Sequence, residues 1–295
     1  MQLRRRKDFF PKRLVDIFCF LFIAILFPIV SLFDIIVVLP AVHSPQTLTY
    51  KFIFALSIFL VYNIMANLFA TMTVDTSVNA ININTKVPPS STEEDWFKCS
   101  YCNKLAPPRS YHCKVCTTCI IKRDHHCVFT GCCIGHCNIR FFALFLFYLF
   151  IGSLISFCYL NYYMFELNGD TFLRKLSFYK MTFPILLFSG NKWYNLHLAF
   201  YNLNIIALVI STVLLIYHGI PILKGGTSFE RRLNYPYSNG LYNNFKDIFG
   251  KRMYLAWISP FISSELLDNG VSVLTNKPNQ RPSRKRSRSR RKSYL

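Results

Sequence analysis

Apolar residues gather in four long runs along the chain, separated by segments richer in polar residues. A helix needs about 20 mostly apolar residues to cross the hydrocarbon of a bilayer, and each run is long enough. The first run is too long for the core of a cleaved signal peptide and lacks a small-residue cleavage site. The pattern predicts an all-α polytopic membrane protein whose four transmembrane helices lie in Ile17–Leu39, Phe52–Met72, Phe141–Phe165 and Leu196–Leu223.

A fifth apolar stretch, Met181–Phe188, is too short to cross a bilayer and follows Lys180. We expect it to be interfacial or lumenal. The polar segment between the second and third runs, and the segments at both ends, hold most of the charge. We therefore divide the chain into six segments. The first three are a basic cytosolic tail (1–13), two transmembrane helices (14–72) and a cysteine-rich cytosolic segment (73–140). The last three are two transmembrane helices with a lumenal loop (141–223), a packed cytosolic element (224–262) and a basic disordered tail (263–295).

The positive charge is unevenly distributed. The formal net charge is +20, which by itself would raise nucleic acid as a partner. However, 29 of the 34 Lys and Arg precede the first run, lie in 73–140 or follow residue 223. By the positive-inside rule these three segments, including both termini, are cytosolic. Their basic residues suit the anionic cytoplasmic face of a lipid bilayer, and we expect no nucleic-acid partner.

Nine cysteines and four histidines lie between Cys99 and Asn138. Their paired C-x2-C units with a nearby histidine have the spacing of tetrahedral zinc sites. The cytosol is reducing, so metal binding or catalysis is expected here rather than disulfides. A nucleic-acid-binding zinc finger is disfavoured, because no helix with base-reading side chains follows the ligands. Thirteen candidate ligands also exceed what two closed four-ligand sites can use.

The centre of this block reads Asp124-His125-His126-Cys127. A histidine can take the proton of a neighbouring thiol or, once charged, hold the thiolate, and a carboxylate can orient that histidine. The same four residues would also serve as plain zinc ligands. From the residues alone, a nucleophile and a ligand both remain open for Cys127.

The whole block, C-x2-C-x9-H-C-x2-C-x2-C-x4-D-H-H-C-x5-C-x4-N, resembles the cysteine-rich domain of the DHHC protein S-acyltransferases (palmitoyltransferases). The resemblance continues outside the block. Thr227-Ser228-Phe229-Glu230 is similar to the family's TTxE motif, and the segment from Gly240 through Asn244-Phe245 to Gly250 resembles its C-terminal element. The resemblance covers about residues 14–262 and identifies the chain as a divergent member of this family. It implies a small cytosolic domain with two zinc ions between the second and third spans.

The resemblance implies a role for each residue of the block. One structural zinc ion would be held by Cys99, Cys102, His112 and Cys119, and a second by Cys113, Cys116, His126 and Cys133. That scheme makes Cys127 the nucleophile, His125 its general base and Asp124 the group that orients His125. Arg109 is the expected contact for the phosphates of the co-substrate, a long-chain acyl-CoA such as palmitoyl-CoA.

The implied enzyme is a protein-cysteine S-palmitoyltransferase that acylates cytosolic cysteines of membrane-associated client proteins. Endoplasmic reticulum or Golgi is the membrane that the family suggests. The alternative is a catalytically silent membrane scaffold that keeps the zinc fold. We expect the acyl chain to enter a cavity among the four spans, where each buried methylene contributes about 0.8 kcal/mol. Ser153 and Ser156 are candidates to line its closed end, because both are small among large aromatic residues.

The chain departs from the family pattern at three places. Val128-Phe129 follows the central cysteine, where Pro with Trp or Phe is usual. The DPG motif after the second span is reduced to Asp75-Thr76-Ser77, so its turn must form without glycine. Cys132 stands where Asn is common and would compete for zinc beside Cys133. We expect these departures to affect rate and client range more than the reaction itself.

Overall fold

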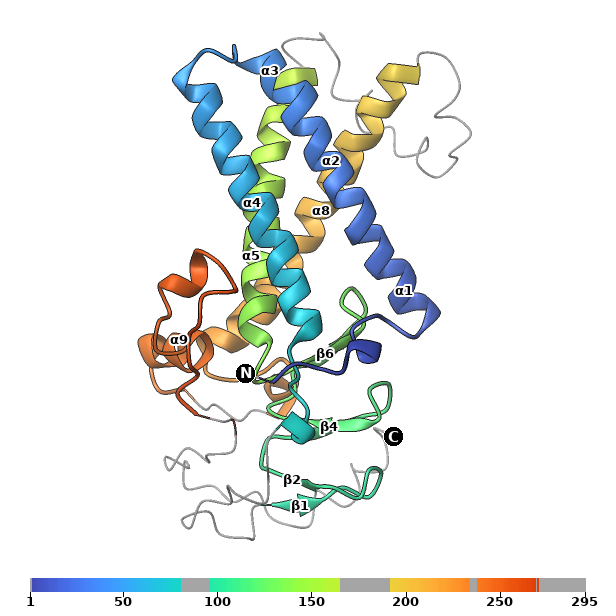
Figure 1. The fold of residues 1–295 in the computed structure, drawn as a ribbon, viewed down its shortest axis with the longest axis vertical. Helices are drawn as coiled ribbons and strands as arrows, with labels where there is room; N and C mark the ends of the chain where they lie inside the picture. Colours follow the sequence, from blue (N-terminus) through green and yellow to red (C-terminus); the bar gives the residue numbers. More distant parts are fainter. Residues whose placement is uncertain (1, 81–95, 165–191, 234–237, 269, 271–295) are drawn as a thin grey trace.

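The computed structural model describes residues 2–80, 96–164, 192–233, 238–268 and 270. The expected interfacial stretch Met181–Phe188, the end of the third run at Phe165 and the Arg-rich part of the tail from residue 271 lie outside the described residues. Four long apolar helices stand side by side, with a small cysteine-rich domain beneath one end of them (Figure 1). The predicted membrane fold is therefore confirmed.

Each of the four spans begins before the apolar run that predicted it. The first covers Leu14–Val42 and contains two π-helical turns, Phe22–Leu26 and Asp34–Val38, between its three α-helical parts. Thr47 caps the second span by accepting a hydrogen bond from the backbone N–H of Tyr50 at 3.2 Å. The helices are α1 (Leu14–Leu21), α2 (Phe27–Phe33), α3 (Leu39–Val42), α4 (Leu48–Thr73), α5 (Ile139–Tyr162) and α8 (Lys192–Leu223).

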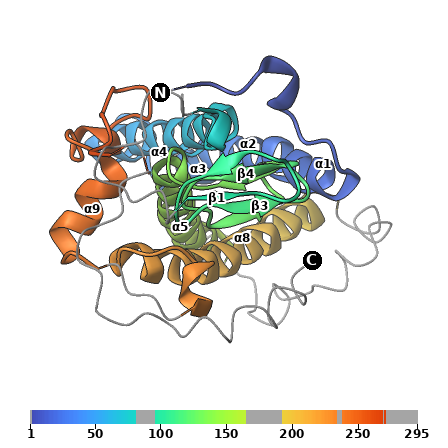
Figure 2. The same ribbon diagram turned by 90° about the horizontal axis from the view of Figure 1, so that it is seen from below.

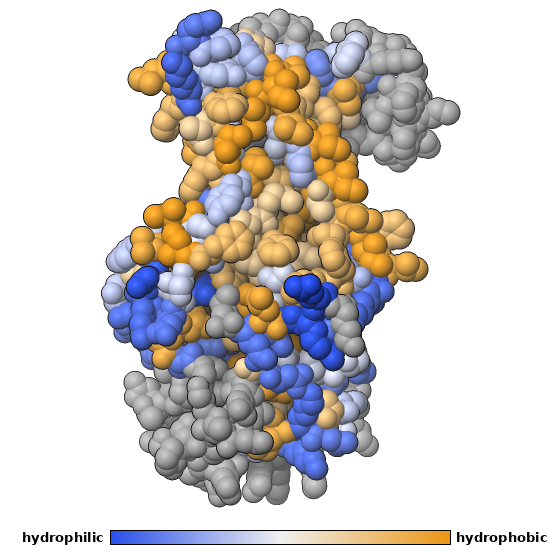
Figure 3. Space-filling view, viewed as in Figure 1, coloured by the Kyte–Doolittle hydropathy of each residue, from blue (hydrophilic) through white to orange (hydrophobic). Residues whose placement is uncertain are grey.

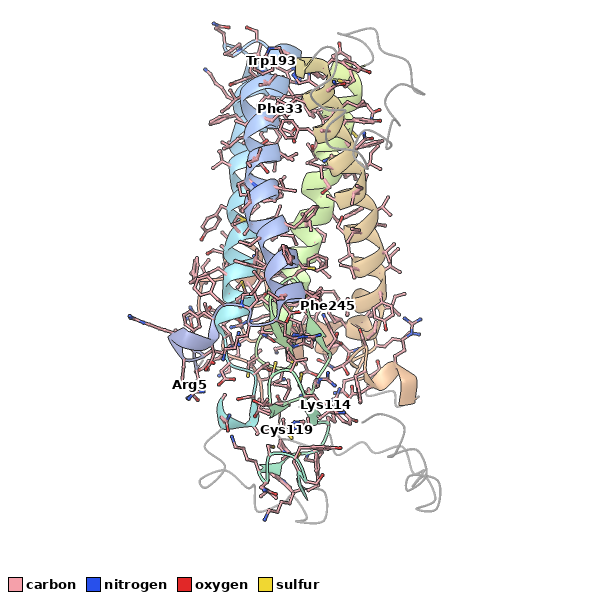
Figure 4. All side chains as sticks on the ribbon, turned by 90° about the vertical axis from the view of Figure 1, so that its right-hand side faces the viewer. Arg5, Phe33, Lys114, Cys119, Trp193 and Phe245 are labelled. Carbon is pink, nitrogen blue, oxygen red and sulfur yellow. The ribbon has the colours of Figure 1, made fainter. Side chains whose placement is uncertain are left out.

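The outer surface of the helices is apolar, as a lipid environment requires. Ile36 on the first span, Phe52 on α4 and Val213 on α8 are all more than half exposed. In the space-filling view, apolar side chains dominate the middle of the molecule, while polar side chains gather at the lower end and in a smaller patch at the top (Figure 3). Trp193 lies at the end of the bundle opposite Lys114 and Cys119 (Figure 4). The protein is an integral membrane protein.

The cysteine-rich domain consists of short antiparallel hairpins rather than helices. Seen from below, the domain lies in front of α4, α5 and α8 (Figure 2). Each strand is only two or three residues long, so contacts beyond the hairpin ladders must supply much of their stability. The hairpins pair β1 (Phe97–Lys98) with β2 (Leu105–Ala106), β3 (Tyr111–Cys113) with β4 (Thr118–Ile120), and β5 (His125–Cys127) with β6 (Cys132–Ile134).

Two buried polar residues attach this domain to the helices. The Asn138 side-chain amide donates to the carbonyls of Thr71 at 3.1 Å and Cys133 at 3.0 Å, joining the end of α4 to the last hairpin. Thr76 accepts from the Cys137 N–H through its hydroxyl at 3.1 Å. The turn that lacks glycine is made by Asp75, whose carboxylate accepts from the Ser77 N–H at 2.8 Å. This Asx turn forms without a glycine.

The segment after α8 folds back against the lower end of the bundle. The buried Asn244 on α9 (Leu241–Phe249) donates to the Leu223 carbonyl at 2.7 Å, which satisfies a free carbonyl at the end of α8. Contacts continue beyond the boundary predicted at residue 262, since Lys122 forms an ion pair with Asp268 at 3.2 Å. Single turns of 3₁₀ helix cover Arg6–Asp8, Val78–Ala80, Glu230–Leu233 and Leu255–Trp257.

Candidate active site and metal centres

The first group of candidate metal ligands is brought together by the first two hairpins. His112 on β3 lies directly opposite Cys119 on β4, and its Nδ1 is 3.6 Å from the sulfur of Cys99. The sulfur atoms of Cys102 and Cys119 are 3.7 Å apart. The ligand atoms all lie within 4.8 Å of one another in the group Cys99, Cys102, His112 and Cys119.

The second group has the same composition and connects the second hairpin to the third. His126 on β5 lies directly opposite Cys133 on β6, and its Nδ1 is 3.4 Å from the sulfur of Cys116 and 3.9 Å from that of Cys113. The ligand atoms again lie within 4.8 Å of one another in the group Cys113, Cys116, His126 and Cys133.

Each group offers three thiolates and one imidazole, a donor set that suits tetrahedral zinc. Zinc would cross-link hairpins too short to be stable alone, and both sites would be closed by four protein ligands. These two groups bring together all eight residues expected to bind metal. The residues present therefore fit two structural zinc ions.

Strand geometry points adjacent side chains of β5 and β3 in opposite directions. Side chains alternate between the two faces of a strand, so His125 and Cys127 on β5 share one face while His126 takes the other. His126 therefore reaches the second metal group, and its two neighbours point toward the helices. The same alternation on β3 sends His112 to the first metal group and Cys113 to the second.

The remaining face of β5 carries a hydrogen-bonded chain of three side chains. Nδ1 of His125 lies 2.7 Å from Oδ2 of Asp124, and His125 is also hydrogen-bonded to the thiol of Cys127. Because a carboxylate only accepts, Nδ1 carries the hydrogen and the other ring nitrogen serves the thiol. Cys127 belongs to neither metal group. Its arrangement is that of an activated nucleophile.

The electrostatics of these three groups favour a thiolate beside an imidazolium. Burial opposes the charged form of His125, but hydrogen bonds with Asp124 and Cys127 outweigh it and raise the pKa of His125 to about 9. Burial would raise the pKa of the Cys127 thiol, yet the hydrogen bond and positive charge of His125 hold it below its ordinary value. Burial likewise opposes ionisation of Asp124, but its two histidine partners keep the pKa of this carboxyl well below its usual range.

Cys127 opens onto a cavity of about 330 Å³ among the four spans. Its lining is mainly apolar and includes Phe142 and Phe145 of α5 beside the thiol. From His218 to Asn204 the cavity follows α8 for fourteen residues, about 21 Å at 1.5 Å per residue. That depth is comparable to the length of an extended sixteen-carbon chain.

Near its far end the cavity is lined by polar side chains from three spans. The Ser156 hydroxyl on α5 donates to Oδ2 of Asp34 at 2.6 Å and accepts from the Asn204 amide at 2.8 Å. Ser153, one turn nearer to Cys127 on the same helix, is buried and also lines the cavity. Both serines expected at the closed end therefore face this space.

Comparison with known proteins identifies the family. Residues 92–234 match the profile described as DHHC palmitoyltransferase, and this range contains both metal groups, the three-residue chain and Glu230. The chain belongs to the DHHC palmitoyltransferase family.

Curated relatives agree with this family. The chain is 32% identical over 181 residues to "Probable protein S-acyltransferase 12" of Arabidopsis thaliana, covering 59% of this chain and 57% of that protein. It is 27% identical to "Probable palmitoyltransferase ZDHHC24" of Mus musculus, covering 75% of this chain and 78% of the relative. The Rattus norvegicus protein of the same name is 26% identical over 90% of this chain and 92% of its own length.

The TTxE-like segment of this DHHC protein is built as a capping box. Thr227 Oγ1 accepts from the Glu230 N–H at 3.2 Å, and Glu230 Oε2 accepts from the Thr227 N–H at 3.0 Å. The serine that replaces the second threonine, Ser228, donates its backbone N–H to Oδ1 of Asp124 at 2.5 Å. The contact is made by backbone, so serine can replace threonine without removing it.

Arg109 lies against this segment. Its guanidinium makes a two-pronged ion pair with the buried Glu230, with Nε at 2.5 Å from Oε1 and Nη2 at 2.7 Å from Oε2. Such a pair holds the cysteine-rich domain to the segment that follows α8. Binding of acyl-CoA phosphates by Arg109 stays a prediction, and in this structure the guanidinium also anchors the DHHC domain.

Cys132 lies outside both metal groups, although it neighbours Cys133. It pairs with Cys127 across the β5–β6 hairpin, and its sulfur faces the Thr71 carbonyl and the Thr130 hydroxyl. Burial raises the pKa of the Cys132 thiol to about 12. Competition for zinc, which the sequence suggested, therefore finds no support in the position of this thiol.

Two site residues were missed from the sequence. The buried Asp16 on α1 lies 3.1 Å through Oδ2 from Nε2 of His126, so it can orient this ligand from behind. The buried His218 on α8 lies 2.9 Å through Nδ1 from Oδ2 of Asp124. His218 lies inside the fourth apolar run, and that signal could have identified it, because an ionisable residue is costly in a membrane. Asp16 immediately precedes the first run, where a charged residue is ordinary and gives no such signal.

Proposed function

We propose that this protein is a protein-cysteine S-palmitoyltransferase that carries the acyl group on Cys127. The observation that carries the proposal is the position of this thiol. It is left over from both metal groups, hydrogen-bonded to His125, and set at the mouth of an apolar cavity deep enough for a long acyl chain. If Asp124, His125, His126 and Cys127 served only as zinc ligands, the protein would not need an apolar cavity beside them.

The reaction proceeds in two thiol-exchange steps. His125 accepts the Cys127 proton, and the thiolate attacks the thioester carbonyl of a long-chain acyl-CoA. The new carbon–sulfur bond forms at Cys127, the bond to CoA breaks, and the CoA sulfur leaves with the proton returned by His125. In the second step His125 takes the proton of a client cysteine, whose thiolate attacks the carbonyl of the acyl-enzyme. A thioester forms on the client, the carbon–sulfur bond to Cys127 breaks, and Cys127 regains the proton from His125. Asp124 keeps the His125 ring oriented and stabilises its positive charge.

The two zinc ions would be structural. Through His126 on β5 and Cys133 on β6, the second ion would hold these two strands in register, so that His125 and Cys127 stay aligned on the face toward the helices. Clients would be membrane-associated proteins with cytosolic cysteines near the bilayer. The distribution of Lys and Arg supports cytosolic termini, and the family resemblance favours the endoplasmic reticulum or Golgi as the resident membrane.

Incubation of the purified protein with labelled palmitoyl-CoA tests this function. We expect label to appear on the protein, to be released by neutral hydroxylamine as a thioester, and to pass to a cysteine-containing peptide attached to the same vesicle. A matching peptide with serine in place of cysteine is the control. A silent scaffold would acquire no hydroxylamine-sensitive label, and that result would reject the enzyme.

The polar end of the cavity should determine which acyl-chain lengths the enzyme prefers. Ser153→Phe places a large ring inside the cavity, so chains that reach it would meet overpacking strain of about 1–3 kcal/mol. We expect competition assays against palmitoyl-CoA to show preference shifted toward shorter acyl-CoA. Ser156→Phe should act deeper in the cavity and also breaks the hydrogen bonds with Asp34 and Asn204.

Leu154→Phe is the matched control for this prediction. Leu154 lies beside Ser153 on α5 but is 38% exposed and does not line the cavity. Its substitution should leave the chain-length profile unchanged. An unchanged profile in both serine variants would mean that the acyl chain lies elsewhere.

A further inference from the structure

His218 is a buried histidine in the lower part of the membrane-spanning helix α8. A polar ring in such a place is costly unless it is hydrogen-bonded. The zinc groups do not include it, and the acyl-transfer steps described above do not need it as an acid or base. Its position beside the reacting groups therefore calls for a role of its own.

The contacts of His218 fix its hydrogen atom. Nδ1 lies 2.9 Å from Oδ2 of Asp124 and 2.8 Å from the Ser228 hydroxyl oxygen. The carboxylate only accepts, so Nδ1 must carry the hydrogen, and the Ser228 oxygen shares the same N–H. One ring nitrogen of His218 is thus committed to Asp124.

Asp124 is consequently held from three directions. His125 and His218 both donate to Oδ2, and the Ser228 N–H donates to Oδ1. Only His125 comes from the cysteine-rich domain, whereas the other two donors come from α8 and the segment after it. The carboxylate that orients His125 is therefore aligned by the membrane helix, and it can rotate only if these bonds break.

The two imidazole rings also restrain each other by packing. The His125 and His218 rings stack at 4.4 Å between centroids, with 27° between their planes. Phe142 presents an edge contact to each ring, at 5.1 Å and 5.2 Å. The orientation of His125 toward Cys127 thus depends on the ring beneath it as well as on the shared carboxylate.

We infer that His218 is a positioning residue for acyl transfer, acting through Asp124 and the stacked His125 ring. The inference rests on the proposed function of Cys127. Misplacement of a reacting group by about 1 Å can reduce a rate about 10²-fold, so loss of this support should be easy to measure. A metal ion held by Asp124, His125 and His218 is the competing reading, since these three donors also lie within 4.8 Å of one another.

Three substitutions separate positioning from packing. His218→Asn keeps an N–H donor near the place of Nδ1, His218→Gln moves the donor outward toward the place of Nε2, and His218→Leu removes it. We expect single-turnover labelling with palmitoyl-CoA to stay within a few fold of the unsubstituted protein for Asn. For Gln and Leu the rate should fall about 10-fold to 10²-fold.

Zinc content and thermal unfolding in detergent are measured on the same samples, and the zinc content should remain at two ions per chain. His197→Asn and His197→Leu are matched controls, because His197 lies on the same helix against Phe33 and Tyr163, outside the cavity lining. They should leave the labelling rate unchanged.

The outcomes are distinct. Equal rates for His218→Asn and His218→Gln, or wild-type rates for all three variants, would overturn the positioning role. So would a third zinc ion that disappears in the variants. If the unsubstituted protein takes no label at all, the proposed function has failed, and that result is separate from the comparison among variants.

Discussion

Cys127→Ser should abolish the hydroxylamine-sensitive label from palmitoyl-CoA while leaving two zinc ions per chain. The substitution removes the thiol that we propose forms the acyl-enzyme, and an alcohol in the same place is a far weaker nucleophile than a thiolate beside His125. Both metal groups keep their four ligands, because Cys127 belongs to neither. Thioester label by gel fluorography and zinc by mass spectrometry are measured on the same preparation.

Cys132→Ser is the control for this substitution. Cys132 lies opposite Cys127 in the hairpin, is equally buried, and has a thiol whose pKa burial raises to about 12. It should keep both the label and the zinc. If Cys127→Ser retained the label or lost one zinc ion, the assignment of Cys127 as the nucleophile and not a zinc ligand would be wrong.

His125→Ala and His126→Ala should fail in different ways although the residues are adjacent. His125→Ala removes the group that takes the thiol proton, so acyl-enzyme formation should fall about 10²-fold or more with the zinc content unchanged. His126→Ala removes a ligand from a closed site, so it should lose zinc and destabilise the whole protein, because metal affinity here is folding energy. Labelling rates, zinc analysis and thermal unfolding measure the difference.

His136→Ala provides the control for these two variants. His136 is the remaining histidine of the cysteine-rich block, belongs to neither metal group, and pairs instead with Asp268 at 3.0 Å. Its substitution should preserve both zinc ions and the labelling rate. Equal zinc loss in the His125 and His126 variants would contradict the division of labour that strand alternation imposes.

The spans and the metal groups were the most predictable parts of the molecule. Apolar runs of the length of a bilayer need no tertiary information, because the membrane itself is the partner of their surfaces. The C-x2-C spacing is also a local property, and it was enough to predict metal sites in the cysteine block. Yet the residues alone could not distinguish a nucleophile from a ligand at Cys127. The family resemblance favours the nucleophile, and the position of Cys127 outside both metal groups supports that proposal.

Contacts between distant segments were not readable from the chain. Asp16 lies 110 positions before His126 along the sequence, and His218 lies 94 after Asp124. Nothing in a local pattern says which buried polar residues of separate helices will meet. Arg109 shows the same difficulty, since its charge suggested CoA phosphates, while the fold brings its guanidinium to Glu230.

The sequence by itself determined four helices long and apolar enough to cross a membrane and a cysteine block with the spacing of zinc sites, because hydrophobic length and ligand spacing are local properties. The division of that block into two ligand sets came from the family resemblance. Only the tertiary structure decided which face of β5 meets the helices, how deep the cavity beyond Cys127 is, and that a histidine of α8 shares the carboxylate of Asp124. These features depend on how the cysteine-rich domain packs beneath the helices, and packing joins residues whose separation along the chain carries no signal.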